Sequence, residues 1–308
     1  MMWRWICVCL GSLVAMFWNV ENFFDPFDDP LKNDDEFTAA ADRRWTWTRF
    51  EAKRDGIAQT IAATGDVWGE LPSVVGLAEV ENRLVVSQLV RKTLLEELGY
   101  GFVHRESPDA RGMDVALLYR KDRFRVAAVD SLRIPEIVTR DILYVKLEER
   151  SALPEQHAAD PLHAFVVHLP SKRGGPRSSE ARRQAALAVL ERAVDSLRRE
   201  EAAPRIVVMG DFNDTGCHVR TLYAVPPDPQ QPARSVPEGT LKYHGRWERI
   251  DHFFVSEPDH TVMRIFAPAF VLEADPVWLG VKPRRTYVGP RYNGGLSDHL
   301  PIIMQISR

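Results

Sequence analysis

The stretch Val-Val-Met-Gly-Asp-Phe-Asn (207–213) is an apolar run that closes on a carboxylate and an amide two residues apart. A run of this kind is typical of a buried strand that delivers polar groups to the edge of a sheet. Near the end of the chain, Gly-Gly-Leu-Ser-Asp-His-Leu-Pro (294–301) places Asp298 and His299 just ahead of the last apolar run. The two stretches together supply a base, an amide donor and an imidazole, a set suited to attack on a phosphate ester.

Two earlier apolar runs also end on oxygen-bearing side chains. Phe-Trp-Asn-Val-Glu-Asn (17–22) brings out Asn19, and Val-Val-Gly-Leu-Ala-Glu-Val (74–80) brings out Glu79. A lone carboxylate at the end of a buried strand is costly unless it is paired or bound to a cation. Since Mg²⁺ takes oxygen ligands and usually only one or two carboxylates, the sequence indicates a site for a hard divalent cation.

Six short motifs follow one another along the chain: Trp-Asn (18–19), the strand that ends on Glu79, Val-His-Leu-Pro-Ser (167–171), Gly-Asp-Phe-Asn (210–213), Arg-Ile-Asp-His (249–252) and Ser-Asp-His (297–299). In this order, over residues 16–303, the set resembles the endonuclease/exonuclease/phosphatase superfamily, which includes deoxyribonuclease I and the sphingomyelinases. Each motif is weak alone, whereas six of them in family order are specific. The segments 106–119 and 168–175 resemble a bacterial branch of this family that has no agreed substrate.

Apolar runs with the length of strands alternate with segments of helical period along the chain. Strands are expected at 13–19, 74–79, 114–119, 141–147, 163–168, 205–210, 251–255 and 299–306, and helices at 48–63, 83–98 and 179–199. This alternation predicts an α/β architecture. The family resemblance implies two packed mixed β-sheets flanked by helices, a four-layer, deoxyribonuclease I-like sandwich with the site at one edge.

The resemblance also implies metal-assisted attack of water on a phosphate ester, with Mg²⁺ or Mn²⁺ as the cofactor. The expected metal ligands are Glu79, Asn19 and Asp298. The expected catalytic residues are His168, Asp211, Asn213, Asp251, His299 and Arg140. Asp211 would orient or deprotonate the water. His299 would donate to the phosphate, while Asp251 holds its other ring nitrogen and favours the charged ring.

Three further side chains are expected to contact the phosphate. Asn213 lies two residues after Asp211 and would project from the same side if the strand geometry continued. His168 ends its own strand and would be a second donor, and by family position Arg140 would add a positive charge. Asn213 and His168 also have ordinary structural explanations, because Gly-Asp-Phe-Asn is often a turn and a histidine such as His168 is often a satisfied core residue.

The chain carries a formal net charge of −3, so no global basic field favours nonspecific binding to nucleic acid. Basic clusters nevertheless lie beside the motifs, at 172–183 and 282–291. Lys172, Arg173 and Arg111 are candidates to contact phosphates of the substrate. A solvated surface is the ordinary explanation of such charged runs.

Residues 1–12 combine one arginine with an apolar stretch, which resembles a short signal peptide or an N-terminal extension. The apolar stretch continues into the first strand without an Ala-x-Ala cleavage signal, so export is only slightly favoured over a cytoplasmic location. Residues 13–308 are expected to form a single domain, because motifs from one end to the other must meet in one site. No segment approaches the ~18–20 apolar residues of a membrane span, and nothing indicates a protein partner.

Three functions are open on the sequence alone. The leading one is a nuclease-like phosphodiesterase, for which nucleic acid is a candidate substrate. The first alternative is the same chemistry on a lipid or sugar phosphate, which the net charge favours and the basic segment 172–183 opposes. The second is a non-catalytic binding protein with the same fold, and the presence of every motif residue argues against it.

Overall fold

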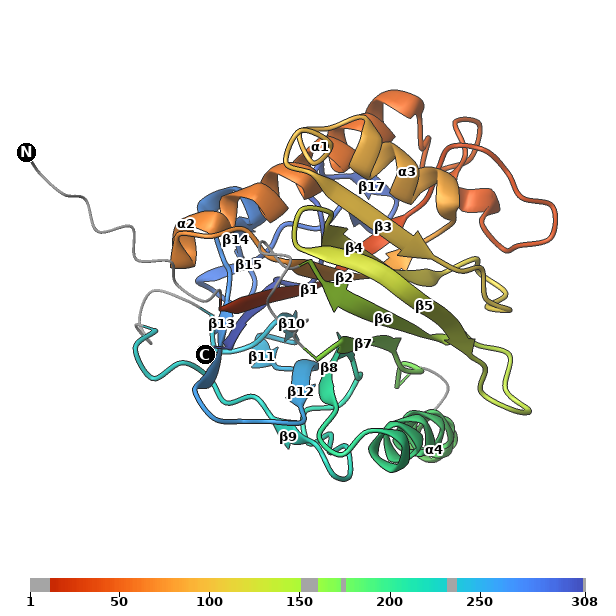
Figure 1. Ribbon diagram of the computed structural model, residues 1–308. Helices are drawn as coiled ribbons and strands as arrows, with labels where there is room; N and C mark the ends of the chain where they lie inside the picture. Colours follow the sequence, from red (N-terminus) through yellow and green to blue (C-terminus); the bar gives the residue numbers. More distant parts are fainter. Residues whose placement is uncertain (1–11, 151–159, 173–175, 232–236, 307–308) are drawn as a thin grey trace, which may run out of the picture.

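The computed structural model of the protein describes residues 12–150, 160–172, 176–231 and 237–306. Two six-stranded mixed β-sheets dominate it (Figure 1). Across the first sheet lie, in order, β13 (Thr261–Ile265), β18 (Ile302–Ile306), β1 (Leu13–Phe23), β2 (Val74–Val80), β4 (Asp114–Arg120) and β3 (Tyr100–His104). Across the second lie β5 (Phe124–Leu132), β6 (Ile142–Glu149), β7 (Leu162–His168), β8 (Arg205–Asp211), β12 (Asp251–Val255) and β9 (Tyr223–Ala224).

Shorter elements surround the two sheets. Three small hairpins pair β10 (Leu241–Tyr243) with β11 (Arg246–Glu248), β14 (Leu272–Ala274) with β15 (Val281–Pro283), and β16 (Tyr287–Val288) with β17 (Arg291–Tyr292). The helices are α1 (Trp47–Ala63), α2 (Gly65–Trp68), α3 (Arg83–Arg91) and α4 (Pro176–Glu200). Single 3₁₀ turns occupy Asp35–Phe37 and Ala269–Val271.

Side-chain packing divides the fold into four layers. A Cβ atom on Gly76 of β2 would lie only 2.6 Å from the sulfur of Met209 in β8, so the two sheets pack closely at their centre. α1 and α3 cover the outer face of the first sheet, and α4 covers the outer face of the second, where Leu190 and Val194 pack with Phe165 (Figure 1). The four-layer α/β sandwich expected from the sequence is therefore confirmed.

One parallel pair of strands in each sheet positions the candidate site. β1 runs parallel to β2, and β7 runs parallel to β8. Parallel neighbours end at the same edge of a sheet. Regular pairing of β1 with β2 stops at Asn19, just before Glu79, and the last pair of β7 with β8 joins His168 to Asp211. Because these strands are apolar and buried, their polar side chains are concentrated where regular pairing stops.

Some expected element boundaries were wrong. The helix expected at 83–98 ends at Arg91, where the Thr93 hydroxyl donates to the Leu89 carbonyl and accepts from the Leu95 N–H, so a turn replaces the next helical turn. The strand expected at 299–306 begins only at Ile302, since Pro301 has no N–H to pair. Strands β3, β5 and β13 were not expected, because β3 and β13 have only 5 residues each and Phe124 is the only buried residue of β5.

No helix in the described part of the chain is long and apolar enough to cross a membrane. The segment expected to be a signal or extension falls almost entirely outside the described residues, which begin at Ser12. Arg173, one of the expected phosphate contacts, also lies outside them.

Candidate active site

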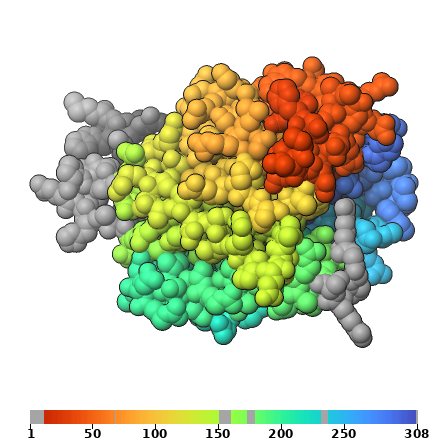
Figure 2. Space-filling view, turned by 90° about the vertical axis from the view of Figure 1, so that its right-hand side faces the viewer, coloured from red at the N-terminus to blue at the C-terminus, as the bar shows by residue number. Residues whose placement is uncertain are grey.

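The polar strand ends of both sheets meet at one edge of the molecule. Asp251 begins β12 directly opposite Asp211, because β12 is antiparallel to β8. Asp298 and His299 come from the loop before β18. Figure 2 views this edge, where the red-orange chain after β1 lies above the yellow-green loop after β5. The sequence-predicted residues of both sheets are therefore brought into one region.

His299 and Asp251 form a tight buried pair. His299 Nδ1 lies 2.8 Å from Asp251 Oδ2, and His299 Nε2 lies 3.8 Å from Asp211 Oδ2. Burial alone would lower the pKa of His299, but the carboxylates of Asp251, Asp211 and Asp298 raise it well above its usual value. The ring is therefore a cation at neutral pH, with its Nε2–H on the side of Asp211.

Asp211 lies at the centre of these contacts. Its Oδ2 accepts a hydrogen bond from the Asn19 amide at 3.1 Å, and its Oδ1 accepts one from the backbone N–H of Asn213 at 2.9 Å. Burial, reinforced by repulsion from Asp251, raises the pKa of Asp211 to about 7, although His299 acts in the opposite direction. A carboxylate that titrates near neutrality is suited to take a proton from water.

Glu79 is held at the mouth of the site by two donors. The Asn19 amide donates to Glu79 Oε1 at 3.3 Å, and the backbone N–H of Asn22 donates to Oε2 at 2.9 Å. Glu79 itself has a φ of 62°, a left-handed conformation that is uncommon for a residue with a side chain. Such a conformation is typical of positions where the surrounding structure fixes a functional group.

The oxygens around Glu79 fit a hard divalent cation. The side chains of Glu79 and Asp298 are 18% and 24% exposed, so both carboxylates can be reached from solvent. Asn19 Oδ1 accepts from the backbone N–H of Glu21 at 3.0 Å and keeps a second lone pair. Carboxylate and amide oxygens are the ligands that Mg²⁺ and Mn²⁺ prefer.

A second set of potential ligand atoms lies deeper in the site. Asp211, Asp251 and His299 each offer one such atom, and these atoms lie within 4.8 Å of one another. A protonated imidazole has no free lone pair for a metal, so the charged ring of His299 makes this set less suitable than the Glu79 oxygens. The described residues thus separate the partly exposed oxygens of Glu79 and Asp298 from the buried group of Asp211, Asp251 and His299.

An ionic network that sequence analysis missed lies behind Asp298. Arg285 donates from Nε to Glu21 Oε1 at 2.9 Å, and its NH2 group lies 3.0 Å from Asp298 Oδ2. Lys53 is buried and donates to the backbone carbonyl of Glu21. Burial lowers the pKa of Lys53 to about 8, although the charge of Glu21 opposes this shift. The only sequence signal was the location of Arg285 in the basic cluster 282–291.

Arg140 holds the end of β7 rather than projecting freely into the site. Its Nε donates to the His168 carbonyl at 2.9 Å, and its NH1 group lies 3.3 Å from Asp109 Oδ2. Its NH2 group lies 2.7 Å from His168 Nε2, and because a guanidinium only donates, this nitrogen is the acceptor. Burial, together with the charges of Arg140 and Arg111, lowers the pKa of His168 well below its usual value. His168 is therefore neutral here.

The expectation that strand geometry continues to Asn213 was wrong. β8 ends at Asp211, and Asn213 has a φ of 51°, so the chain turns between them. The Asn213 amide donates to the Leu169 carbonyl at 3.0 Å. An amide group has two N–H donors, so one of them stays available to another acceptor.

The expected outer phosphate contacts differ in their surroundings. Arg111 Nε lies 3.5 Å from Asp109 Oδ1, and its side chain is partly exposed. Lys172 is exposed at the start of the basic segment. Asp109 was not singled out by the sequence analysis, although it contacts both Arg111 and Arg140.

The fold and the site together define a hydrolase that acts on phosphoester bonds. The chain belongs to the endonuclease/exonuclease/phosphatase family, whose model matches residues 14–308. A search of curated proteins gives no significant match.

Solved structures with the same fold cover nearly the whole chain. An endonuclease/exonuclease/phosphatase family protein from Bacteroides thetaiotaomicron has a TM-score of 0.61 and 15% identity, covering 96% of this chain and 97% of that chain. A mannosyl-6-phosphatase from the same organism has a TM-score of 0.60 and 14% identity, covering 95% and 98%. Truncated TDP2 from Caenorhabditis elegans has a TM-score of 0.57 and 16% identity, covering 96% and 98%. At such identities the likeness establishes the fold, and the substrate is a separate question.

Proposed function

We propose that the protein is a Mg²⁺- or Mn²⁺-dependent phosphodiesterase of the nuclease-like type, which hydrolyses a phosphate ester with activated water. The observation that carries this proposal is the position of Asp211 between Asn19 and His299. Asn19 links Asp211 to Glu79, and His299 lies on its other side with Asp251 behind. A base and a cationic donor thus lie next to the carboxylate that would hold the metal.

A divalent ion held by Glu79, with oxygens of Asn19 and Asp298, would polarise a phosphoryl oxygen and offset its developing charge. Arg285 supports this role because its guanidinium group lies 3.0 Å from Oδ2 of Asp298 and leaves Oδ1 of Asp298 for the ion. The Asn22 N–H fixes the Glu79 carboxylate in the same way. Both carboxylates are therefore oriented before any ligand arrives.

Asp211 would take the proton from the attacking water. The pKa of this carboxylate is raised to about 7, so it can accept a proton near neutral pH and release it afterwards. His299 would donate from Nε2 to the phosphate, and the Asp251 contact at 2.8 Å would keep its ring charged and oriented. A preoriented cationic donor of this kind stabilises charge that develops in the transition state.

The remaining residues would bind the phosphate from the side of the second sheet. Asn213 retains one amide N–H, and Arg140 fixes the position of His168 through both its ring and its carbonyl. To donate a hydrogen bond to the phosphate, His168 would first have to lose the hydrogen bond that it accepts from Arg140. Direct donation by Arg140 and His168 is for this reason the least supported part of the proposal.

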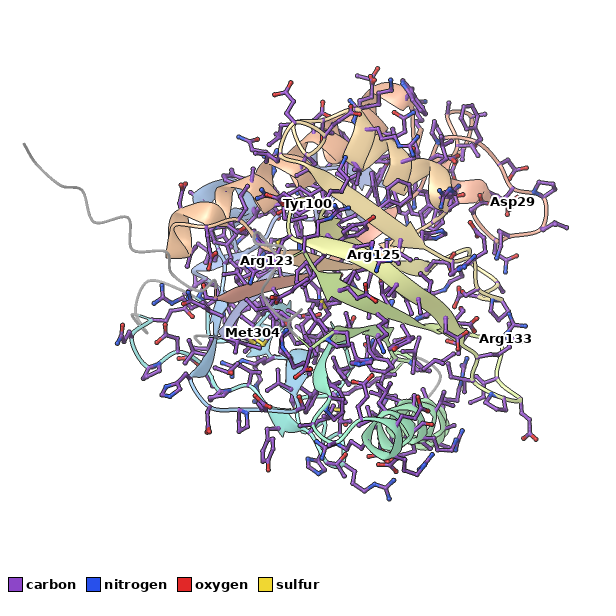
Figure 3. All side chains as sticks on the ribbon, viewed as in Figure 1. Asp29, Tyr100, Arg123, Arg125, Arg133 and Met304 are labelled. Atoms are coloured by element: carbon purple, nitrogen blue, oxygen red, sulfur yellow. The ribbon has the colours of Figure 1, made fainter. Side chains whose placement is uncertain are left out.

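A second candidate is a smaller sugar or lipid phosphate ester. Figure 3 labels Asp29 and Arg133 on the same side of the molecule, which is the side of the strand ends. Asp29 belongs to the acidic run at 25–36, and such a run would repel an extended polyanion. The net charge of −3 acts in the same direction.

A panel of substrates separates these candidates. Hydrolysis of a chromogenic phosphodiester, plasmid DNA, sphingomyelin and a sugar phosphate is compared with Mg²⁺, with Mn²⁺ and with EDTA. Glu79→Ala is the matched control, at a metal concentration that is sufficient for the wild type only. Nuclease-like function predicts that DNA is cleaved by the wild type and spared by the variant. Cleavage of the sugar phosphate or sphingomyelin alone would select the second candidate. Binding without any hydrolysis would indicate a non-catalytic protein.

A further inference from the structure

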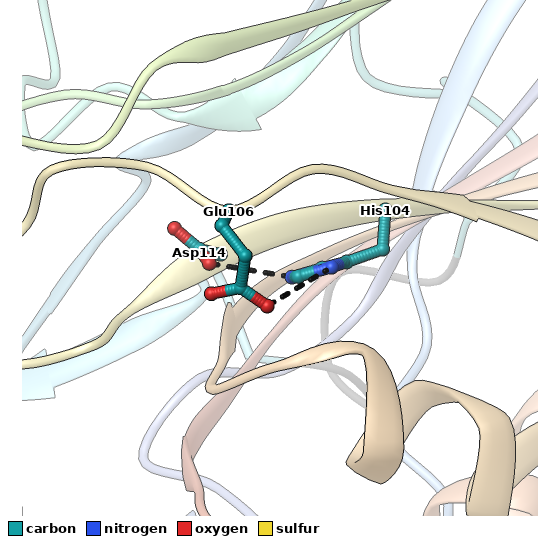
Figure 4. A group of neighbouring side chains, drawn as sticks. All are labelled: His104, Glu106 and Asp114. Atoms are coloured by element: carbon teal, nitrogen blue, oxygen red, sulfur yellow. Dashed lines mark ion pairs between the residues drawn. The ribbon is translucent and has the colours of Figure 1, made fainter. Parts of the chain in front are cut away.

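A second cluster of ligating side chains lies at the same sheet edge, beyond β2 and outside the site described above. His104 ends β3, Asp114 begins β4, and Glu106 lies in the loop between them. One ligand atom from each residue can be chosen so that all three lie within 4.8 Å of one another. Figure 4 shows both carboxylates gathered on one side of the His104 ring.

Two atoms of this cluster are buried and lack any hydrogen-bond partner. They are His104 Nε2 and Asp114 Oδ2, which face each other at 3.3 Å, and both side chains are 1% exposed. The other oxygen of Asp114 accepts from the backbone N–H of Ser107 at 3.1 Å and from its hydroxyl. The Asp114 carboxylate is thus fixed on one side and unsatisfied on the side of the histidine, where an unpaired polar atom is costly.

The separation of these atoms fits a bound cation better than a hydrogen bond. A charge-assisted N–H···O bond is about 2.7–2.9 Å long. Two ligands on a tetrahedral ion with bonds of about 2.0–2.1 Å are about 3.3 Å apart. The Nε2–Oδ2 distance of 3.3 Å matches the second arrangement.

The charges of the cluster also favour a bound cation. Glu106 Oε1 lies 3.8 Å from His104 Nδ1, so each ring nitrogen has a carboxylate as its nearest charged neighbour. A neutral imidazole has one N–H and cannot serve both carboxylates. Two negative groups pressed together in this way are relieved by a divalent ion.

We propose that His104, Asp114 and Glu106 form a second metal site, which takes a zinc-class transition ion rather than Mg²⁺. His104 Nε2 and Asp114 Oδ2 are its fixed ligands. Glu106, whose side chain is 57% exposed, is its adjustable ligand and marks the path of entry. One imidazole nitrogen with two carboxylate oxygens is a donor set of zinc sites, whereas Mg²⁺ prefers oxygen alone.

This second site anchors the loop that supports the first one. Loop residues 105–113 leave the cluster and carry Asp109, which pairs with Arg140 at 3.3 Å. Lys32 donates to the carbonyls of Ser107 and Asp109 at 3.2 Å each and holds the same loop from outside. An ion at the base of this loop therefore stiffens the support of Arg140 without touching the substrate.

The test is zinc binding by the full chain, stripped of metal and then held in excess Mg²⁺ so that the Glu79 site is saturated. Wild-type protein is expected to retain about one more equivalent of Zn²⁺ than His104→Ala, measured by elemental analysis after dialysis. His218→Ala is the matched control, because His218 is an exposed histidine outside the cluster, and its zinc content should equal that of wild type. Zinc should also slow amide exchange in residues 105–113 of wild type and not of His104→Ala.

Equal zinc content in wild type and His104→Ala would overturn the proposal and leave the cluster as an ion pair of a charged histidine. If His104→Ala does not fold, Glu106→Gln decides the question, because its exposed side chain can be changed without disturbing the core. That variant is expected to bind Zn²⁺ at least about tenfold more weakly. An unchanged affinity of Glu106→Gln would equally overturn the proposal.

Discussion

The two sheets supply unlike halves of the active site. In the half from the first sheet, the carboxylates of Glu79 and Asp298 are partly exposed and contact amide and guanidinium groups. In the half from the second sheet, Asp211 and Asp251 are buried beside the ring of His299. The first half is open and rich in oxygen, whereas the second is closed, and the pKa values of Asp211 and His299 in it are raised.

This difference follows from what each kind of chemistry needs. Coordination needs charged oxygens that an ion can reach from solvent. Proton transfer near neutral pH needs a carboxylate whose pKa has been raised, and burial is the main way to raise it. Asp211 obtains this burial because β12 pairs with its strand and His299 lies over it. The Asn19 amide connects the halves, since it donates to both Glu79 and Asp211.

Removal of a divalent ion from the open half is expected to have the largest effect on hydrolysis. EDTA should abolish hydrolysis, and added Mg²⁺ or Mn²⁺ should restore it, because a divalent ion held by Glu79 would polarise the phosphoryl oxygen. Glu79→Ala should require more metal for half-maximal activity while its circular dichroism stays that of wild type. The measurement is initial rate against metal concentration for both proteins. Full activity in EDTA would contradict the role assigned to this half.

Removing the cationic donor of the closed half should have the next largest effect. His299→Ala is expected to lower kcat by about 10²–10⁴-fold, the range for lost acid–base and oxyanion donors. Asp251→Asn should cost less, since the ring remains but loses its charged partner at 2.8 Å. Steady-state rates on a chromogenic diester measure both, with metal titration as the control that the open half is intact. Wild-type rates for His299→Ala would remove the pair from the mechanism.

The pH dependence should come from the closed half. Burial raises the pKa of Asp211 from 3.8 to about 7, so its base form is lost as pH falls, and kcat/KM should fall about tenfold per unit on the acid side. A cation bound nearby favours the charged carboxylate and should move this limb to lower pH. The measurement is kcat/KM between pH 5 and 9 at two metal concentrations. If the acid side of the profile stays at the same pH at both metal concentrations, the charge of the ion does not act on Asp211.

The same shift makes a prediction about stability. A pKa raised in the folded protein means that Asp211 contributes stability below 3.8, which is lost as pH rises through about 7. The Asp211→Asn variant has no carboxyl group here and does not lose stability in this way. The difference in free energy of unfolding, variant minus wild type, should therefore increase between pH 5 and pH 8. Urea denaturation at the two pH values measures the difference. A constant difference would indicate that Asp211 is not shifted.

The sequence predicted the strand ends of both halves but not the contacts between them. Apolar runs that end on Asn19, Glu79 and Asp211 are a local signal, so these positions could be read directly. The pairing of Arg285 with Glu21 joins opposite ends of the chain and has no local pattern. Such contacts exist only after the sheets have packed.

The other features that the sequence did not predict depend on backbone conformation, strand pairing and side-chain contacts in the folded chain. Asn213 was expected to follow strand geometry, yet its φ of 51° depends on a turn that the Gly-Asp-Phe-Asn letters allow without requiring. His104 was left without a role because its partner Asp114 is brought near only when β3 pairs with β4. Arg140 was expected near the site, but its fixed contacts with His168 became visible only in the fold.

The smallest expected effect lies outside both halves, in the basic segment that follows His168. Lys172 is exposed, and with Arg173 it would meet phosphates beyond the reacting one, with equal strength in the ground and transition states. Replacing both by Ala should therefore raise KM a few-fold, roughly two to five, with little change in kcat. The effect should be larger for DNA than for a small chromogenic ester and should shrink at high salt.

This last comparison needs KM for both substrates at low and high ionic strength, with Arg182→Ala as the matched control for loss of a positive charge further along the same basic segment. Arg182 donates to the Val138 carbonyl at 3.3 Å, so its guanidinium group already has a partner and should matter less. An unchanged KM of the double variant on DNA would mean that the segment is only solvated. That outcome would favour a small phosphate ester as the substrate.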